Sequence, residues 1–293
     1  MNDQEIIRSL VGGTIKSITL ITGKGYVNRV YKVVKSDEPV IVRLNDESEL
    51  KRFEKEAWCM ERALKAGIPS PKLVDLGVVN NSAYMILSFV AGKNGKEIVA
   101  DNCKVWNKIG TYAKKINSIS TSGFGENVVA PGVFSGSWEK YLKYNIESLC
   151  PKDELLKLGV ISQRQSELIK EEFTRLRDKQ FNFALVHGDL SLENVIVNGE
   201  DITLIDWGCA ESTMVPHMEI IAVLQNLQDI QGSYFNDFLA GYGISRDEFE
   251  LIRPEIDSLV LLQAVDKLRW AIDKKPDQIS SFSDRVERIV KRI

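Results

Sequence analysis

The stretch that most restricts the possible folds of this chain runs from residue 184 to residue 208. An apolar run leads into His187-Gly188-Asp189, Asn194 follows five residues after this aspartate, and a second apolar run ends at Asp206. Short apolar runs separated by polar turns predict strands. We expect a strand, a polar loop and two further strands that place Asp189, Asn194 and Asp206 at the same edge of a small sheet. Oxygen-bearing side chains of this kind suit a hard divalent cation beside a proton acceptor.

Length, composition and charge limit the classes of protein to which this chain can belong. A chain of 293 residues suits one two-lobed unit or two domains. With 44% hydrophobic and 27% charged residues, its composition is typical of a soluble globular protein. The net charge of −3 and the pI near 5.7 argue against nucleic acid as a partner and are compatible with a cationic small substrate.

Other sequence signals argue against export, membranes and structural metal. The N-terminus lacks the basic start and apolar core of a signal peptide, and no apolar run approaches the roughly 18 residues of a membrane helix. Four scattered cysteines without a CxxC pair indicate neither a zinc site nor a disulfide framework, and they fit a reducing cytoplasm. Cys209 follows the turn at 206–208, and we expect it to be a small buried filler.

The first 91 residues favour an antiparallel sheet of five strands with one long helix. Strands are expected at 15–22, 28–34, 40–44, 73–76 and 82–90, after a short helix at 4–10. The long helix is expected at 47–66, with an apolar stripe formed by Leu50, Phe53, Ala57, Met60 and Leu64. Small and polar residues at 91–96 mark a lobe boundary.

The rest of the chain, residues 92–293, is expected to be mostly helical around the strands of 184–206. Its helices are expected at 105–119, 138–149, 163–179, 217–229, 233–241, 246–251, 254–272 and 281–292. The fold class is therefore α+β with two lobes.

Two motifs in register resemble the kinase-like small-molecule phosphotransferases, the family of aminoglycoside phosphotransferases and choline kinases. The first is His187-Gly188-Asp189-Leu190 with Asn194, and the second, Ile205-Asp206-Trp207-Gly208, places its acid 17 residues after the first. The resemblance covers essentially the whole chain in the order of its elements. It implies a protein-kinase-like fold, with a nucleotide-binding lobe at 1–91 and a catalytic and substrate-binding lobe at 92–293. The alternative is a polar hairpin whose acids and amide serve turn geometry.

The resemblance assigns a role to each matched residue. Asp189 would accept the proton of the substrate hydroxyl or orient that hydroxyl. Asn194 and Asp206 would hold Mg²⁺ against the phosphates of ATP or GTP. His187 would support the loop, and Glu219 stands where relatives carry an acid that braces the loop from the following helix.

In the first lobe the resemblance implies a nucleotide site. The segment with Gly23, Gly25 and Asn28 resembles a nucleotide-covering hairpin. Arg43 stands where kinases carry a phosphate-binding lysine, and Glu56 is its expected partner, with Lys32 as a rival cation. The lobe connector would bind the purine through the Ser88 carbonyl and the Val90 amide, with Leu87 behind them.

Two departures from the family pattern matter. Lys115-Ile116-Asn117 replaces a common Leu-His pair, which leaves one structural hydrogen bond in doubt. The second acid is followed within about ten residues by a helix start, so the chain has no activation segment on which a protein substrate could dock. This argues against a protein kinase.

The acceptor would lie between the catalytic loop and the last helices. Residues expected to contact it are Glu211, Asp229, Asp266 and Trp270, because acids beside an aromatic ring can bind ammonium groups. The alternative for the last two is a solvated helix face; Arg269 and Asp273 are expected on the same side.

We therefore expect an ATP- or GTP-dependent, Mg²⁺-requiring O-phosphotransferase, active in the cytoplasm as a monomer or homodimer. The leading acceptor is aminoglycoside-like, with a role in antibiotic resistance. Choline or another amino alcohol and a sugar are the alternative acceptors. Two other classes stay open, a nucleotide-binding pseudokinase and a structural protein with a fortuitous motif.

Overall fold

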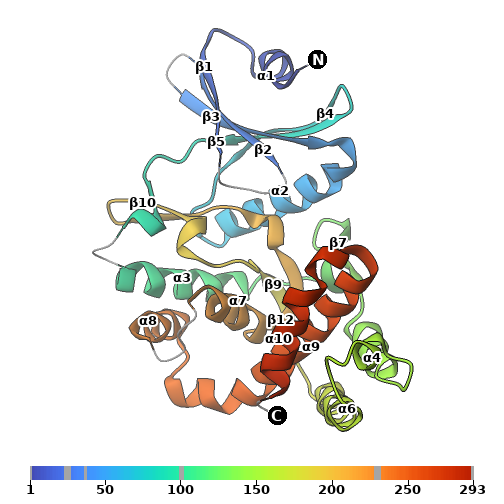
Figure 1. The fold of residues 1–293 in the computed structure, drawn as a ribbon. Helices are drawn as coiled ribbons and strands as arrows, with labels where there is room; N and C mark the ends of the chain where they lie inside the picture. Colours follow the sequence, from blue (N-terminus) through green and yellow to red (C-terminus); the bar gives the residue numbers. More distant parts are fainter. Residues whose placement is uncertain (1, 23–27, 36–37, 99–101, 228–231, 292–293) are drawn as a thin grey trace.

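A computed structural model describes residues 2–22, 28–35, 38–98, 102–227 and 232–291, and it has two lobes (Figure 1). The elements of the first lobe are α1 (Asp3–Val11), β1 (Ile15–Leu20), β2 (Arg29–Lys35), β3 (Glu38–Asp46), α2 (Leu50–Lys65), β4 (Leu73–Val79) and β5 (Ser82–Ser88). The strands form one antiparallel sheet in the order β1-β2-β3-β5-β4. The predicted five-stranded antiparallel sheet is therefore confirmed.

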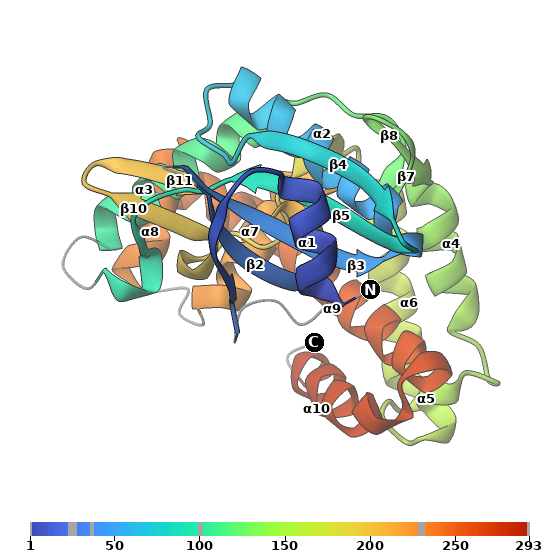
Figure 2. The ribbon, with the colours of Figure 1, turned by 90° about the horizontal axis from the view of Figure 1, so that it is seen from above.

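The two helices of this lobe cover opposite faces of the sheet. Alternation of side chains along β3 sends Val42 and Leu44 toward α1, where they pack with Ile6 and Ile7. On the other face, Met85 of β5 belongs to the core that α2 shares with the second lobe. Figures 1 and 2 show α1 across the outer face of the sheet and α2 beneath it. Helix α2 is thus held between the lobes.

The apolar stripe expected on α2 identifies only some of its buried residues, because this helix is buried on more than one side. Phe53 and Met60 are buried as expected, but Leu64 is 36% exposed. Lys55 and Glu56 are buried instead, at 4% and 1% exposure. Lys55 reaches Gly208 of the second lobe and Glu56 pairs with Arg43 of β3, and sequence periodicity reveals neither partner.

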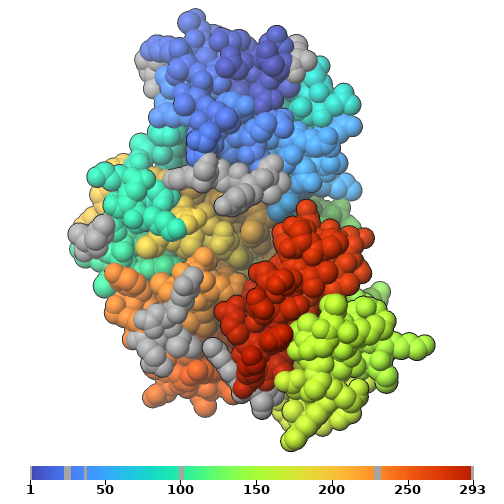
Figure 3. Space-filling model, in the orientation of Figure 1, coloured from blue at the N-terminus to red at the C-terminus, as the bar shows by residue number. Residues whose placement is uncertain are grey.

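The second lobe combines helices with two small sheets. Its helices are α3 (Asn102–Ile116), α4 (Trp138–Ser148), α5 (Glu154–Lys157), α6 (Gln163–Arg177), α7 (His217–Leu227), α8 (Ser233–Tyr242), α9 (Arg246–Lys274) and α10 (Ile279–Val290). Its strands are β6 (Lys93–Asn94), β7 (Phe124–Ala130), β8 (Val133–Gly136), β9 (Asn182–Val186), β10 (Val195–Asn198), β11 (Asp201–Leu204) and β12 (Glu211–Val215). Figure 3 shows the last helices on the surface beside α4 to α6. Among the described residues, no helix has both the length and the apolar character needed to span a bilayer.

The strands around the polar loop belong to two different sheets, so the expected single sheet edge is wrong. Strand β9 pairs with β12 in the order β8-β7-β12-β9, whereas β10 and β11 pair with each other and with β6. The loop after β9 therefore passes from one sheet to another. Strands β7, β8 and β12 were not predicted, because glycines and polar residues interrupt 122–136 and because β12 gains its partner β9 only in the tertiary fold.

The two helices expected at 246–251 and 254–272 are a single helix, α9, with Pro254 inside it. Proline normally interrupts a helix, because it lacks an N–H and its ring meets the preceding turn. Here Phe249 before the proline and Ile256 after it are both buried in the same core. Tertiary packing therefore overrides the local preference.

The connector between the lobes is attached to the catalytic loop region. Strand β6 pairs with β10, and the Asn94 side chain donates to the Glu193 carbonyl at 2.6 Å. A Cβ on Gly92 would lie 2.5 Å from the Val197 carbonyl oxygen, and one on Gly95 2.6 Å from the Leu192 carbonyl oxygen. The expected division at residues 91 and 92 stays a prediction, but this segment is fixed firmly to the second lobe.

Helices α3 and α8 pack closely through two glycines. A Cβ on Gly110 would lie 2.1 Å from the Phe238 carbonyl oxygen, and one on Gly241 1.8 Å from the Asn107 carbonyl oxygen. Neither distance is compatible with a side chain at its present place. The two backbones can approach only because both positions are glycine.

We expect Gly110→Ala to lower the free energy of unfolding by about 1–3 kcal/mol, because α8 must move away from α3. Urea unfolding would measure the change. Lys108→Ala, at an exposed position of the same helix, is the control and should stay within about 0.5 kcal/mol of the wild type. Equal stability of both variants would show that the helices separate without cost.

Candidate active site

The polar loop after β9 begins with a turn that only glycine fits well. Gly188 has φ of 77°, and a Cβ there would lie 2.3 Å from the carbonyl oxygen of Cys209. The loop therefore passes directly against the turn that follows β11. This contact brings the segments of Asp189 and Asp206 together although they start from different sheets.

Asp189 and Asn194 are joined by hydrogen bonds across the loop. The Asn194 amide nitrogen donates to the Asp189 carboxylate and to the Asp189 backbone carbonyl, both at 2.8 Å. Asn194 is buried, and it ends a short 3₁₀ turn at Leu192–Asn194. The amide thus fixes one carboxylate oxygen, while its own side-chain oxygen is left for another ligand.

Asp206 lies in the turn before the 3₁₀ segment Trp207–Cys209. Its φ of 61° is left-handed, a conformation uncommon for residues other than glycine and often found at functional sites. One carboxylate oxygen accepts from the Gly208 N–H at 3.4 Å, and the residue is exposed. The carboxylate is therefore both oriented and accessible.

These oxygens fit a magnesium ion that is shared with a nucleotide. Mg²⁺ is commonly bound by one or two protein oxygens together with water and phosphates. Within the described ranges, no group of three or more His, Cys, Asp and Glu side chains could hold a metal alone. An amide oxygen from Asn194 and a carboxylate from Asp206 match the smaller set.

His187 and Glu219 support the loop from inside the lobe. His187 is fully buried; its Nε2 lies 3.1 Å from the Ile205 carbonyl oxygen, and its ring packs on Trp207. Burial lowers the pKa of His187, which favours the neutral ring. Glu219 accepts hydrogen bonds from the backbone N–H groups of His187 at 3.1 Å and Gly188 at 3.3 Å. This is the contact that the sequence led us to expect of Glu219, while its effect on activity stays a prediction.

The expected pair of Arg43 and Glu56 is present at the first lobe. Both Glu56 oxygens accept from the Arg43 guanidinium, one of them at 3.2 Å. Burial raises the pKa of Glu56, and Arg43 opposes this shift. Lys32, the rival cation, lies over the Phe89 ring with its Nζ 4.1 Å from the centroid. Arg43, and not Lys32, is thus the cation that pairs with Glu56.

Lys55 is a buried residue of this site that the sequence analysis missed. Its Nζ crosses between the lobes and donates to the Gly208 carbonyl at 3.1 Å. Since the N–H of Gly208 contacts Asp206, the lysine holds the same turn from the other side. Its neighbour Glu56 binds Arg43, so adjacent residues of α2 reach both lobes. The place of Lys55 beside Glu56 was the only signal in the sequence.

Other nucleotide-site predictions are placed but not tested by the structure. Asn28 accepts from the Asn45 side chain at 2.7 Å, which joins the start of β2 to the end of β3. Leu87 is buried in the core, Ser88 ends β5, and Val90 is half-buried in the connector. The predicted Gly23 and Gly25, and Asp229 of the acceptor set, lie outside the described residues.

Two of the residues expected to contact the acceptor, Asp266 and Glu211, lie near the same tyrosine. The Tyr141 hydroxyl is hydrogen-bonded to Asp266. Burial is the largest cause of the raised pKa of Tyr141, and the charges of Asp266 and Glu211 raise it further. Burial and the nearby Glu126 raise the pKa of Glu211 to about 7. Asp266 and Glu211 therefore share one neighbourhood.

The prediction that Arg269 and Trp270 lie on the same side of α9 is not met. Trp270 is 43% exposed and has the Lys267 Nζ 5.6 Å from its ring centroid. Arg269, expected on the same side, points inward to Asp153 at 2.7 Å and Asn145 at 2.9 Å. Its place in a buried network turns it away from the exposed side of Trp270.

Two smaller expectations are changed. Cys209 is exposed rather than a buried filler. Asn117, where the family pattern departs, donates to the Leu185 carbonyl at 3.0 Å and accepts from the Tyr242 hydroxyl at 2.8 Å. Asn117 therefore makes two hydrogen bonds at the place where the family pattern departs.

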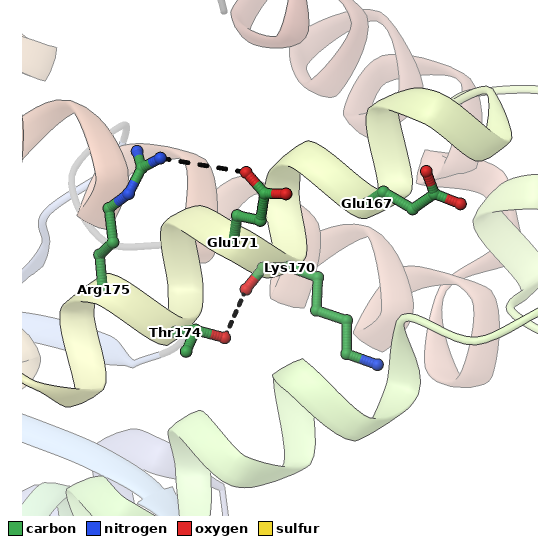
Figure 4. A pocket seen from close by; sticks show the side chains of 5 residues that line it. All are labelled: Glu167, Lys170, Glu171, Thr174 and Arg175. Carbon is green, nitrogen blue, oxygen red and sulfur yellow. Dashed lines mark hydrogen bonds and ion pairs between the residues drawn. The ribbon is translucent and has the colours of Figure 1, made fainter.

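A surface hollow of about 460 Å³ lies away from these residues, along α6 (Figure 4). Its lining residues all come from this one helix: Glu167, Lys170, Glu171, Thr174 and Arg175. Arg175 pairs with Glu171, and Thr174 donates to the Lys170 carbonyl at 2.7 Å. No predicted site residue lines it.

The fold is that of the aminoglycoside phosphotransferases. The ternary complex of a thermostable mutant of APH(4)-Ia with ADP and hygromycin B matches with a TM-score of 0.70 at 16% identity, covering 98% of this chain and 97% of that one. The GDP and kanamycin complex of APH(2")-IIIa matches with a TM-score of 0.70 at 14% identity, covering 99% and 98%. The predicted kinase-like two-lobed fold is confirmed, and the class is a small-molecule phosphotransferase.

The family follows from the sequence itself. A family model described as a phosphotransferase enzyme family, APH, matches residues 18–253. The chain belongs to this family of phosphotransferase enzymes. It is also 26% identical over 113 residues to an uncharacterized protein from the ileS 3' region of Staphylococcus aureus, across 39% of this chain and 84% of that protein.

We expect Lys55→Met to lower the free energy of unfolding by about 1–3 kcal/mol, because the buried Gly208 carbonyl loses its donor while side-chain volume is nearly kept. Urea unfolding would measure the loss. Lys51→Met, at an exposed position of α2, is the control. A Lys55 variant as stable as this control would show that the lysine does not hold the turn.

The buried Glu219 makes stability depend on pH. Its pKa is raised from 4.5 to about 7, so between these values the folded chain keeps a proton that the unfolded chain has released. The stability linked to this proton is complete below the unfolded pKa and is lost as the pH rises toward 7, at up to about 1.4 kcal/mol per pH unit. We expect Glu219→Gln to flatten this decline, measured as the free energy of unfolding across the window.

Glu200→Gln, at an exposed position in the turn after β10, is the matched control and should follow the wild-type curve. Glu211 contributes in the same window, since its pKa is also raised to about 7. The Glu219 variant should therefore keep a smaller slope rather than none. Coincident curves for the Glu219 and Glu200 variants would contradict the assignment.

Proposed function

We propose that this protein is an Mg²⁺-requiring kinase that transfers the terminal phosphoryl group of ATP or GTP to a hydroxyl of a small cationic or polyhydroxylated molecule. The leading candidate for this acceptor is an aminoglycoside-like molecule. The observation that carries the proposal is the pair Asp189 and Asn194, joined at 2.8 Å beside the turn of Asp206. One carboxylate can serve the acceptor while an amide oxygen and a second carboxylate serve the metal. Membership of the phosphotransferase family supports the same reading.

In this proposal each residue has a separate task. Asp189 receives the hydroxyl proton or orients the hydroxyl toward the phosphorus. Asn194 and Asp206 would hold Mg²⁺, which neutralises phosphate charge when bound. Arg43, fixed by Glu56, would bind the phosphates from the first lobe. Positioning and charge neutralisation are the main demands of phosphoryl transfer, and these groups meet them.

The charge around the acceptor side supports a cationic substrate. Glu211 and Asp266 lie near Tyr141, and burial together with the nearby Glu126 raises the pKa of Glu211 to about 7. An ammonium group near these acids would favour their ionised forms. The neighbours bound to hygromycin B and kanamycin fit the same substrate class. A physiological role in antibiotic resistance is part of this proposal.

We expect Asp189→Asn to reduce kcat on the order of 10²–10⁴-fold, while the affinity for the magnesium nucleotide stays near the wild-type value. The assay follows ATP and GTP turnover with aminoglycosides, choline and other amino alcohols, and sugars as acceptors. Asp201→Asn, an exposed acid on β11, is the control for a lost charge. Full activity of the Asp189 variant would remove Asp189 from its proposed task.

The same panel separates the proposal from the other classes. A structural protein would show no Mg²⁺-dependent stabilisation by nucleotide, whereas a ligand at 100 times its Kd adds about 2.7 kcal/mol. Stabilisation without transfer to any acceptor would favour a pseudokinase. Asp206→Ala should lose the Mg²⁺-dependent part of the stabilisation.

A further inference from the structure

Two polar side chains of helix α7 contact the first part of the catalytic loop, residues 187–190. Glu219 and Asn226 are seven residues apart, which is about two helical turns, so they lie on the same side of the helix. Glu219 accepts from the first two N–H groups of the loop, at His187 and Gly188. We therefore expect Asn226, two turns further along the helix, to contact the next part of the loop.

Asn226 contacts the oxygens of that part of the loop. Its side-chain nitrogen donates to the Leu190 carbonyl at 3.1 Å and to the Asp189 Oδ1 at 3.4 Å. It also donates to the Ala222 carbonyl of its own helix at 3.1 Å, which fixes the side chain on α7. All three partners are acceptors, so the amide nitrogen and not the amide oxygen must face them.

The two oxygens of Asp189 are thereby held by different amides. Asn194 donates to Oδ2 from within the loop, and Asn226 donates to Oδ1 from α7. A single donor leaves a carboxylate free to turn about its Cβ–Cγ bond, whereas donors on both oxygens define its plane. Hydrogen bonds to charged groups are also stronger than those between neutral groups.

We propose that Asn226 is a positioning residue that sets the orientation of the Asp189 carboxylate toward the acceptor hydroxyl. The proposal rests on the proposed function, in which Asp189 serves that hydroxyl. Asn226 needs no contact with the substrate for this task. The position requires a donor, because the Asn226 amide nitrogen lies within hydrogen-bonding distance of three oxygens, and its two hydrogens are shared among them. An aspartate of the same shape would place a negative oxygen there instead.

The proposal gives an order of effects that a merely structural role would not. Asn226 is exposed, so its truncation opens no cavity in the core. We expect Asn226→Ala to lower kcat by about tenfold, the effect of one hydrogen bond to a charged group. Asn226→Asp should lower kcat further although it keeps the side-chain shape, and the Kd for the magnesium nucleotide should be unchanged in both variants.

The turnover assay uses the acceptor found by the panel and, in parallel, hydrolysis of MgATP with water as the acceptor. Gln225→Ala and Gln225→Glu make the corresponding two changes at the neighbouring residue, whose side chain contacts Gln263 instead. These controls should keep the wild-type kcat. An Asn226→Asp variant as active as the wild type, or more active than Asn226→Ala, would overturn the proposal.

A second measurement does not depend on any acceptor. The unfolding midpoints of Asn226→Ala, Asp189→Asn and the double variant form a cycle in which contacting residues are non-additive. We expect the double variant to lose less than the sum of the single losses, and additive losses would overturn the proposed contact. If the cycle shows coupling while Asp189→Asn keeps full turnover, the proposed function is wrong, and with it the role of Asn226 in catalysis.

Discussion

The catalytic half of this protein depends on a carboxylate buried beneath the catalytic loop. Glu219 has no exposed surface, and its oxygens accept the N–H groups of His187 and Gly188. Two buried backbone donors would otherwise lack partners, which is costly in a protein interior. By satisfying them, Glu219 fixes the place where β9 ends and Asp189 begins. The left-handed turn at Gly188 and the contact with Cys209 follow from that position.

Helix α2 performs the corresponding task between the lobes. Its adjacent residues Lys55 and Glu56 are both buried and charged, and they face different segments. Glu56 binds Arg43 of the sheet, and Lys55 binds Gly208 of the turn that carries Asp206. Buried charges persist only when they are paired or hydrogen-bonded. One helix therefore connects the cation expected at the phosphates with the acid expected at the metal.

Sequence reasoning succeeded where chemistry and local pattern agree. The motifs at 187–194 and 205–208 identified the family, and alternating apolar residues identified the five-stranded sheet. The pairing of Arg43 with Glu56 also followed from position. It failed for β12 and for the assignment of β9 to a shared sheet, because pairing between distant strands leaves no local signal. Lys55 and Asn226 were missed for a similar reason, because their partners lie more than 30 positions away in the chain and leave no local signal.

The sequence by itself determined which chemical groups are available: the carboxylates of Asp189 and Asp206, the amide of Asn194, and an arginine with its partner acid. These depend on residue type and on spacing within short segments. Only the tertiary structure decided how the groups are held, through Glu219 and Asn226 on one face of α7 and Lys55 on α2. Each of these contacts joins residues more than 30 positions apart in the chain. For Lys55 and Glu219 burial makes such a contact necessary, because a polar group removed from water must find its partner within the protein.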